Sequence, residues 1–284
     1  MKYILIITIG VLLVAGCQQS VKQTVLSQDI VCLLPSLTED LYALGLGDRI
    51  AAVATFCTYP PEAAKLPRVG DCINPNLEAI VRLKPSLVLI GDMQSEAEKK
   101  LKSFKLPVQT FRQSTLTDID FTLFRLGVLF NRQKAADSLI KRMHAELDSI
   151  GRLSAGRSKK RVLFVIGRNP GTLSNLFTIN QKSFLNELLE LAGGVSIFND
   201  ERMIWAKVSL EEVIRRNPEV IIETSTMGHQ DDPAKVWSVM NEVAAVKQER
   251  VYQLSEDFIF IPGPRVVETA KKLYALLNTH DSTR

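Results

Sequence analysis

The strongest constraint on the fold is a twelve-residue pattern that occurs twice in the chain. The first copy covers residues 77–88 (LEAIVRLKPSLV) and the second covers residues 210–221 (LEEVIRRNPEVI). In each copy, apolar side chains at helical spacing are followed by a proline turn and an apolar run, which predicts a short helix leading into a buried strand. Because this helix–strand unit recurs in each half, the sequence predicts two lobes of similar architecture.

Buried strands and helices alternate in both halves of the chain. Strands are expected over residues 30–34, 50–55, 87–90, 108–111, 162–166, 220–223 and 251–254. Helices are expected at residues 77–82, 95–104, 184–192, 209–216 and 264–277, and after the first strand, where Ser36 or Thr38 is the expected cap. Such alternation is typical of βαβ units, so the predicted class is α/β, with two Rossmann-like lobes built on parallel sheets.

The middle of the chain has a different pattern, without a strand signal between residues 117 and 153. Apolar residues recur there at spacings of three and four, at Ala136, Leu139, Ile140, Met143, Leu147 and Ile150. This stripe predicts one helix over residues 133–153, about 30 Å long, which joins the two lobes rigidly. The expected division is a signal peptide and tether at 1–28, an N-terminal lobe at 29–128, a connecting helix at 129–156 and a C-terminal lobe at 157–284.

The N-terminus has the pattern of a secretory signal. Lys2 is followed by an uncharged, mostly apolar run over residues 3–15, which is shorter than the ~20 residues of a membrane-spanning helix. The next residues complete the sequence VAGC at 14–17, which resembles the lipobox of bacterial lipoproteins. That resemblance implies cleavage before Cys17 and a lipid on its thiol, so we expect a membrane-anchored protein of the cell envelope or periplasm.

Charge and cysteine usage argue against two kinds of site. The 35 basic and 31 acidic residues are dispersed along the chain, so no nucleic-acid partner is expected. Three cysteines follow the anchor, Cys32, Cys57 and Cys72, and their spacing is not that of a metal site. An odd number leaves at least one thiol unpaired within a monomer, and the sequence leaves open whether Cys57 and Cys72 form a disulfide.

Several short segments, taken together and in order, resemble a known family. They are residues 34–39 (LPSLTE), 58–61 (TYPP), 76–85 (NLEAIVRLKP), 192–194 (AGG), 205–211 (WAKVSLE) and 264–265 (PR). They resemble the helical-backbone class of substrate-binding proteins of ABC importers, which serve cobalamin, haem and ferric siderophores, and the cobalamin-binding members are the most similar. The resemblance implies a monomer without a cofactor that delivers a small-molecule ligand, here a corrinoid (vitamin B12), to a membrane permease and ATPase complex.

The resemblance also places the ligand between the lobes, where ligands bind beyond the carboxyl ends of parallel strands. The ligand-binding residues that it implies are Phe56, Tyr59, Cys72, Trp205 and Asp257, with Trp205 expected in a loop before the second repeat. Aromatic faces suit the flat, partly apolar corrin ring.

Two positions depart from the cobalamin-binding pattern. Cys72 stands where these proteins often carry a tryptophan, and Ile261 stands where they carry an arginine. These departures keep haem and a ferric siderophore open as alternative ligands. An anionic chelate calls for arginine in the cleft, and Arg68, Arg168 and Arg265 are the candidates.

One glutamate in each repeat matches the family's contact with the permease. Glu78 and Glu211 occupy the same place in the two copies. Two carboxylates on separate rigid lobes would give a two-point electrostatic contact with arginines of the permease, which steers docking and fixes its register. The competing interpretation is that both are ordinary solvated helix residues.

An enzyme on a two-lobed α/β scaffold is the least favoured alternative. The chain contains no GxSxG, P-loop, GxGxxG or HExxH motif. The candidate acids Glu78 and Glu211 fall in different lobes, which suits docking better than paired acid–base chemistry. No catalytic residue is therefore predicted.

Overall fold

The computed structural model describes residues 29–179, 181–198, 205–224 and 231–278. Cys17, and with it the predicted lipid attachment, lies outside the described residues. Within the described ranges, every helix is too short or too polar to cross a membrane.

The first lobe is built on a parallel sheet with the strand order β2-β1-β3-β4. Its strands are β1 (Ile30–Cys32), β2 (Ile50–Val53), β3 (Leu87–Gly91) and β4 (Val108–Phe111), and its helices include α1 (Pro35–Ala43), α2 (Leu77–Leu83) and α3 (Ser95–Ser103). The carboxyl ends of all four strands meet at one edge because the strands are parallel. Each of these strands was predicted within two residues of its ends.

The start of α1 corrects the predicted cap. Leu34 is the N-cap and Pro35 is the first helical residue, so neither Ser36 nor Thr38 caps the helix. Proline suits that position because its fixed φ matches the helix and its missing N–H is not needed there. The hydroxyl of Thr38 instead donates to the carbonyl of Leu34 at 3.0 Å.

The second lobe has a mixed sheet with the order β10-β9-β5-β6-β8, and β7 pairs with β5. Its strands are β5 (Lys160–Gly167), β6 (Leu176–Ile179), β7 (Gly194–Ser196), β8 (Trp205–Val208), β9 (Val220–Thr224) and β10 (Val251–Leu254), and its helices are α6 (Phe184–Leu191), α7 (Leu210–Arg216), α8 (Pro233–Trp237), α9 (Ala244–Lys247) and α10 (Val266–Asn278). β6 is antiparallel to both β5 and β8. The two-lobed α/β fold is confirmed, and the second sheet adds antiparallel strands that the sequence did not predict.

The repeat takes the same structure in both lobes. Asn76 and Ser209 cap α2 and α7, each with a side-chain oxygen that accepts the amide three residues later, at 3.0 and 3.2 Å. Both helices are seven residues long, and both end at a left-handed residue, Lys84 or Asn217. Each then leads into an interior strand of its sheet, β3 or β9.

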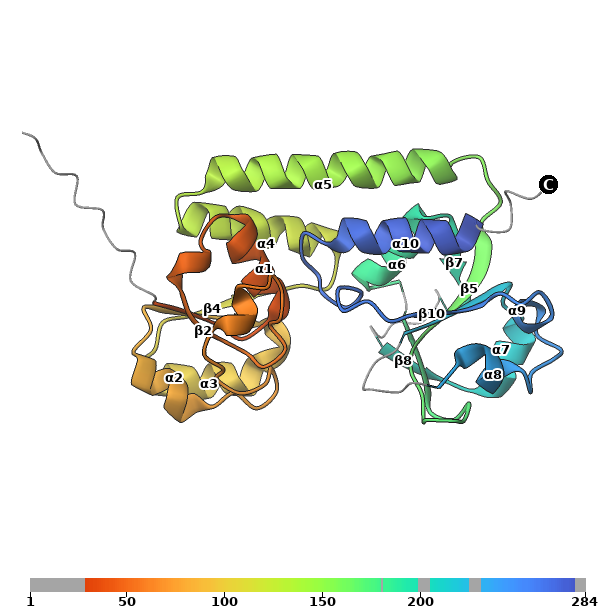
Figure 1. Cartoon of the computed structure of the whole chain (residues 1–284), viewed down its shortest axis with the longest axis horizontal. Coiled ribbons are helices and arrows are strands. Elements are labelled where there is room, and N and C mark those ends of the chain that lie inside the picture. The colour runs from red at the N-terminus through yellow and green to blue at the C-terminus, as the bar shows by residue number, and fades with distance from the viewer. Residues whose placement is uncertain (1–28, 180, 199–204, 225–230, 279–284) are drawn as a thin grey trace, which may run out of the picture.

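One long helix runs over both lobes, and a shorter helix lies antiparallel to it over the first lobe (Figure 1). α5 (Gln133–Ser154) has 22 residues and matches the predicted connecting helix, while α4 (Leu116–Leu129) precedes it and was not predicted. α5 packs into both cores, since Ala136 belongs to the N-terminal cluster and Leu139 to the C-terminal cluster. The single helix α5, about 33 Å long, therefore contacts both lobes.

A buried carboxyl group lies on α1 where the second lobe approaches. Asp40 is fully buried, and neither of its carboxylate oxygens has a hydrogen-bond partner within the described structure. Burial first, and the neighbouring Glu39 second, raise the pKa of Asp40 well above its ordinary value of 3.8. Between pH 3.8 and the raised pKa, the folded protein therefore holds a proton on Asp40 that the unfolded chain releases.

We expect Asp40→Asn to remove a pH dependence of stability. Because the folded pKa of Asp40 is raised, its contribution to stability is fully present below pH 3.8 and is lost as the pH rises through the folded pKa. In that window the free energy of unfolding of the wild type should fall, relative to Asp40→Asn, by about 1.4 kcal/mol for each pH unit. Urea unfolding of both proteins between pH 5 and 8 measures this, and parallel curves would contradict it.

Candidate ligand-binding cleft

A cavity of about 280 Å³ lies between the two lobes. On one side it is lined by residues at the carboxyl ends of β1, β3 and β4, including Leu34, Gly91 and Gln113. On the other side it is lined by the start of α6 at Phe184 and by residues 260–262. It therefore lies at the strand ends where the sequence placed the ligand.

The lining of this cavity is apolar with neutral hydrogen-bonding groups. Leu34, Met93, Phe184 and Phe260 supply the apolar surface, and serine and glutamine side chains supply the polar atoms. Among the described residues that line it, Asp92 alone carries a charge. Such a lining can hold a flat, neutral molecule whose edge offers amide groups.

Exposed apolar side chains follow the strand ends of the first lobe, and of these Met93 lines the cavity. Phe56, which follows β2, is 65% exposed, and Met93, which follows β3, is 82% exposed. Ile73 is 85% exposed and lies next to Cys72 in the chain. Phe56 stays a predicted ligand contact. Met93 lines the cavity and was not predicted, although a large apolar residue just beyond a strand end was a usable signal.

Gln94 ties the loop of Cys72 to the cleft. Its side-chain oxygen accepts the amide of Gly91 at 2.8 Å, and its side-chain amide donates to the carbonyl of Cys72 at 2.5 Å. Because Gln94 also lines the cavity, the predicted position of Cys72 lies beside the candidate site.

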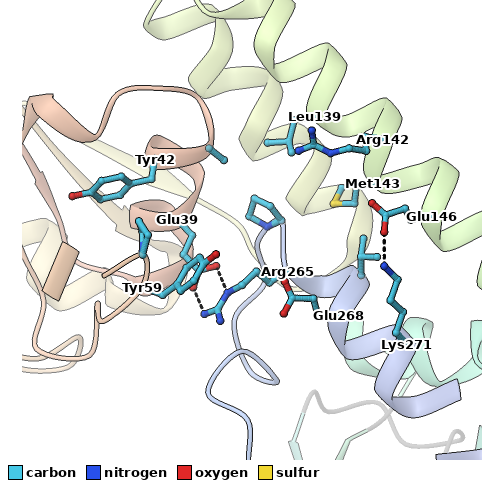
Figure 2. Close-up of a pocket in the computed structure, with 14 residues that line it drawn as sticks. Glu39, Tyr42, Tyr59, Leu139, Arg142, Met143, Glu146, Arg265, Glu268 and Lys271 are labelled. Atoms are coloured by element: carbon cyan, nitrogen blue, oxygen red, sulfur yellow. Dashed lines mark hydrogen bonds and ion pairs between the residues drawn. The ribbon is translucent and has the colours of Figure 1, made fainter. Parts of the chain in front are cut away.

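Tyr59 and Asp257 meet at one arginine. The guanidinium carbon of Arg265 lies 3.9 Å from the ring centroid of Tyr59, and its Nη1 lies 3.1 Å from Oδ1 of Asp257. The same guanidinium binds Glu39 of α1 (Figure 2). The structure thus brings together two predicted ligand residues, and Glu39 was missed because nothing in its local sequence indicates a partner so far along the chain.

Trp205 corrects one expectation. Its backbone begins β8 and pairs with Ile179 of β6, so it does not lie in the predicted loop before the second repeat. The reason is the antiparallel pairing of β8 with β6, which a four-residue run does not reveal. The side chain of Trp205 is outside what the structure describes.

The three candidate arginines for an anionic chelate are all bound to the protein itself. Arg168 is buried and forms ion pairs with Glu223 at 2.7 Å and Asp231 at 2.8 Å. Arg68 donates to three backbone carbonyls of the residues around it. With Arg265 also buried in ion pairs, none of the three offers a free guanidinium to a ligand.

A second cavity of about 470 Å³ lies between α1, α5 and α10 (Figure 2). It is larger than the cleft, and it is lined by Glu39, Tyr59 and Arg265. The predicted ligand residues are not among the described residues that line the cleft itself. Lys271 of α10 and Glu146 of α5 form an ion pair of 2.6 Å at this cavity. Its walls come from both lobes and from the connecting helix.

The predicted docking glutamates occupy equivalent places. Glu78 and Glu211 are each the second residue of their helix, and both are exposed. Glu78 forms an ion pair with Arg82 at 2.7 Å, whereas hydrogen bonds from its own backbone amide and from Ser209 lower the pKa of Glu211. Both helices lie on the side of their lobes away from α5 (Figure 1).

The cysteines of the described chain are all free thiols. Cys32 and Cys57 are buried, and Cys72 is half-buried. Burial, the largest cause, raises the pKa of Cys57 to about 11, so its thiol stays protonated and unreactive at neutral pH. Among these residues there is no disulfide, and none holds Cys57 to Cys72.

Comparison with known sequences identifies a matching protein family and similar proteins. The model of the periplasmic binding protein family matches residues 30–258. A vitamin B12-binding protein of Pectobacterium carotovorum subsp. carotovorum is 32% identical over 257 residues, which covers 89% of each chain. An ABC transporter substrate-binding lipoprotein of Bacillus subtilis, YvrC, is 31% identical over 252 residues, covering 86% of this chain and 78% of YvrC.

Solved structures share the architecture. The periplasmic vitamin B12-binding protein BtuF of Vibrio cholerae superposes with a TM-score of 0.76 at 25% identity, over 91% of this chain and 99% of BtuF. The periplasmic haem-binding protein HutB of the same organism gives a TM-score of 0.77 at 16% identity, over 88% of this chain and 99% of HutB. At that identity the likeness to HutB reaches the fold alone.

Proposed function

The chain belongs to the periplasmic binding protein family, and from this premise we propose that it captures a corrinoid such as vitamin B12 between its lobes. It is the substrate-binding component of an ABC importer. The observation that carries the corrinoid proposal is the cleft itself, whose lining combines apolar side chains with neutral serine and glutamine groups. A corrin is a broad, partly apolar disc edged by amides, and it needs such partners.

The proposed contacts are Phe56, Tyr59, Cys72, Trp205 and Asp257. Exposed apolar surface at Phe56 suits the face of the ring, and its burial by a ligand would be favourable. Asp257 is exposed and could accept a hydrogen bond from an amide of the ligand.

Haem or a ferric siderophore in the same cleft is the alternative. Haem carries two propionate groups and catecholate or carboxylate siderophores are anionic, and a binding site meets such charge with arginine or lysine. Arg168 and Arg265 are engaged in internal ion pairs, and the described residues that line the cleft include no arginine or lysine, which favours the neutral corrinoid.

Delivery to the membrane is proposed to use the two lobes and the N-terminus. Glu78 and Glu211 would contact the permease of the importer, and a lipid on Cys17 would keep the protein at the membrane in the cell envelope. The relatives are transport components, so we propose that the chain has no catalytic activity and that the corrinoid is cargo, not a cofactor.

Ligand titration tests this proposal. We expect cyanocobalamin to quench the tryptophan fluorescence of the soluble form Gln18–Arg284 at a 1:1 ratio, and to bind at least about tenfold more tightly than haem or a ferric siderophore. Trp205→Ala should weaken cyanocobalamin binding about tenfold, because one aromatic contact is lost. Tighter binding of haem or of the siderophore would overturn the choice of ligand.

Trp205→Phe is the matched control for the signal. It keeps an aromatic face and removes one fluorophore, so affinity should stay near the wild-type value while most of the quenching disappears. Trp237 is buried and donates its indole N–H to Glu223 at 3.0 Å, so it contributes a constant background.

A further inference from the structure

Arg265 joins the two halves of the molecule through one buried guanidinium. Its Nε donates to Oε2 of Glu39 at 2.9 Å, and its Nη2 donates to Oε1 of the same carboxylate at 2.5 Å. The two residues are 226 positions apart, and their side chains are only 9% and 3% exposed. Such a two-pronged, charge-assisted pair fixes both distance and orientation.

We propose that Arg265 is a positioning residue that sets the separation of the lobes and holds Tyr59 and Asp257 in place for the ligand. The inference rests on the proposed function, because both residues are proposed ligand contacts. Tyr59 belongs to the first lobe and Asp257 to the second, and both contact this guanidinium directly. A ligand that touches either side chain therefore touches a group whose position Arg265 fixes.

The guanidinium uses three different surfaces at once. One edge binds Glu39, and the flat face lies against the ring of Tyr59 (Figure 2). Another nitrogen binds Asp257. A lysine ammonium could keep the charge, but it has neither the fork nor the flat face. The arrangement is therefore specific for arginine.

The segment that leads to Arg265 packs against the wall of the cleft. A Cβ atom placed on Gly263 would lie 3.7 Å from Cα of Ser36 and from Oδ1 of Asp40, so this segment and α1 are in contact. Ser36 lines the cleft and donates to Oε1 of Gln113 at 2.6 Å. A shift of Arg265 would therefore move α1 and, with it, the first-lobe side of the cavity.

Because the ion pair of Glu39 and Arg265 is buried, loss of Arg265 leaves Glu39 without a partner for its charge. Burial, the largest cause, raises the pKa of Glu39, although Arg265 acts in the opposite direction. Without Arg265, Glu39 would be left uncompensated beside the buried Asp40, and it would take up a proton and lose its contact with the second lobe.

Ligand kinetics with conservative variants test the inference. The variants are Arg265→Lys, which keeps the charge, and Glu39→Gln, which keeps the volume. We expect each to raise the dissociation rate of cyanocobalamin at least about tenfold while its association rate stays within about threefold, because the loss of a buried charged pair acts on retention. Arg49→Lys is the matched control, since Arg49 pairs with Asp29 within the first lobe at 2.7 Å.

Urea unfolding distinguishes a positioning role of Arg265 from a role in stability alone. If Arg265 only stabilised the fold, Arg265→Lys would lower the urea midpoint and leave the dissociation rate of the folded protein unchanged. Dissociation rates within about threefold of wild type for both Arg265→Lys and Glu39→Gln would overturn the inference.

Failure of the proposed function gives a different result. In that case the wild type binds no cyanocobalamin, and amide hydrogen exchange of the unliganded proteins tests the positioning role. Faster exchange in Arg265→Lys over both residues 36–40 and 257–265 would retain that role, and unchanged exchange in either segment would overturn it.

Discussion

Replacing Glu78 and Glu211 together with alanine is expected to abolish delivery of the ligand while leaving its capture intact. The two carboxylates stand at the same position of the two repeats, on helices that lie away from the connecting helix. Each is exposed before docking and would be desolvated against a permease arginine, where truncation of one partner of such a pair costs about 2 kcal/mol or more. Each single variant should therefore weaken docking at least about thirtyfold, and the double variant about a thousandfold.

Uptake assays with the importer in proteoliposomes measure delivery, and equilibrium titration with cyanocobalamin measures capture. Glu96→Ala is the matched control, because Glu96 is an exposed helix glutamate paired with Lys99 at 2.8 Å and lies outside the repeat. If the double variant supports as much uptake as Glu96→Ala, Glu78 and Glu211 do not dock the permease. If the double variant loses as much affinity for cyanocobalamin as it loses uptake, the two glutamates act in ligand binding and not in docking alone.

Arg168→Ala is expected to cause the largest loss of stability. Its side chain is 3% exposed and lies between Glu223 and Asp231, and the carboxylate of Glu223 also accepts the indole N–H of Trp237. Removing the arginine leaves Glu223 as a buried, uncompensated charge, which typically costs about 3–5 kcal/mol. We expect the free energy of urea unfolding at neutral pH to fall by that amount.

Two further proteins control this prediction. Lys99→Ala removes an exposed ion pair and should change stability by less than about 1 kcal/mol. The double variant Arg168→Met, Glu223→Gln also removes the carboxylate that Arg168→Ala leaves without a partner, so it should recover part of the lost stability. A loss below about 1 kcal/mol for Arg168→Ala would show that the pair adds little to the second lobe.

The parts of the fold that sequence predicts well are those with a local signal. β4 and β10 match their predicted bounds at both ends, because each is a short segment with β-branched or aromatic residues between polar or turn residues. The repeat predicted both helix–strand units, α2–β3 and α7–β9, because the cap, the helix and the proline turn of each unit all lie within twelve residues.

The missed elements depend on partners that are distant in the sequence. β6 and β8 are four residues each; β6 forms a strand by pairing with β5 and β8, and β8 by pairing with β6. Their sequences, LFTI and WAKV, carry too little period for a strand to be assigned from the chain alone. The mixed character of the second sheet follows from this pairing.

The candidate site also has features that the sequence predicts and features that depend on distant partners. The location of the cavity beyond the strand ends follows from parallel topology, and the prediction of Phe56 as a ligand contact rests on its place after β2. The meeting of Glu39, Arg265 and Tyr59 could not be predicted, because it depends on how one lobe is set against the other. The pairing of Arg168 with Glu223 likewise depends on the packing of β5 against β9.

Amide hydrogen exchange with and without cyanocobalamin is the most direct measurement of capture between the lobes. Binding should slow exchange in both walls of the cleft together, over residues 91–94 and 113–114 in the first lobe and over residues 183–184 and 260–262 in the second. The outer helix α8 serves as the internal reference and should exchange at the same rate in both states. Slower exchange in one lobe only, or in neither, would contradict a ligand held by the two lobes.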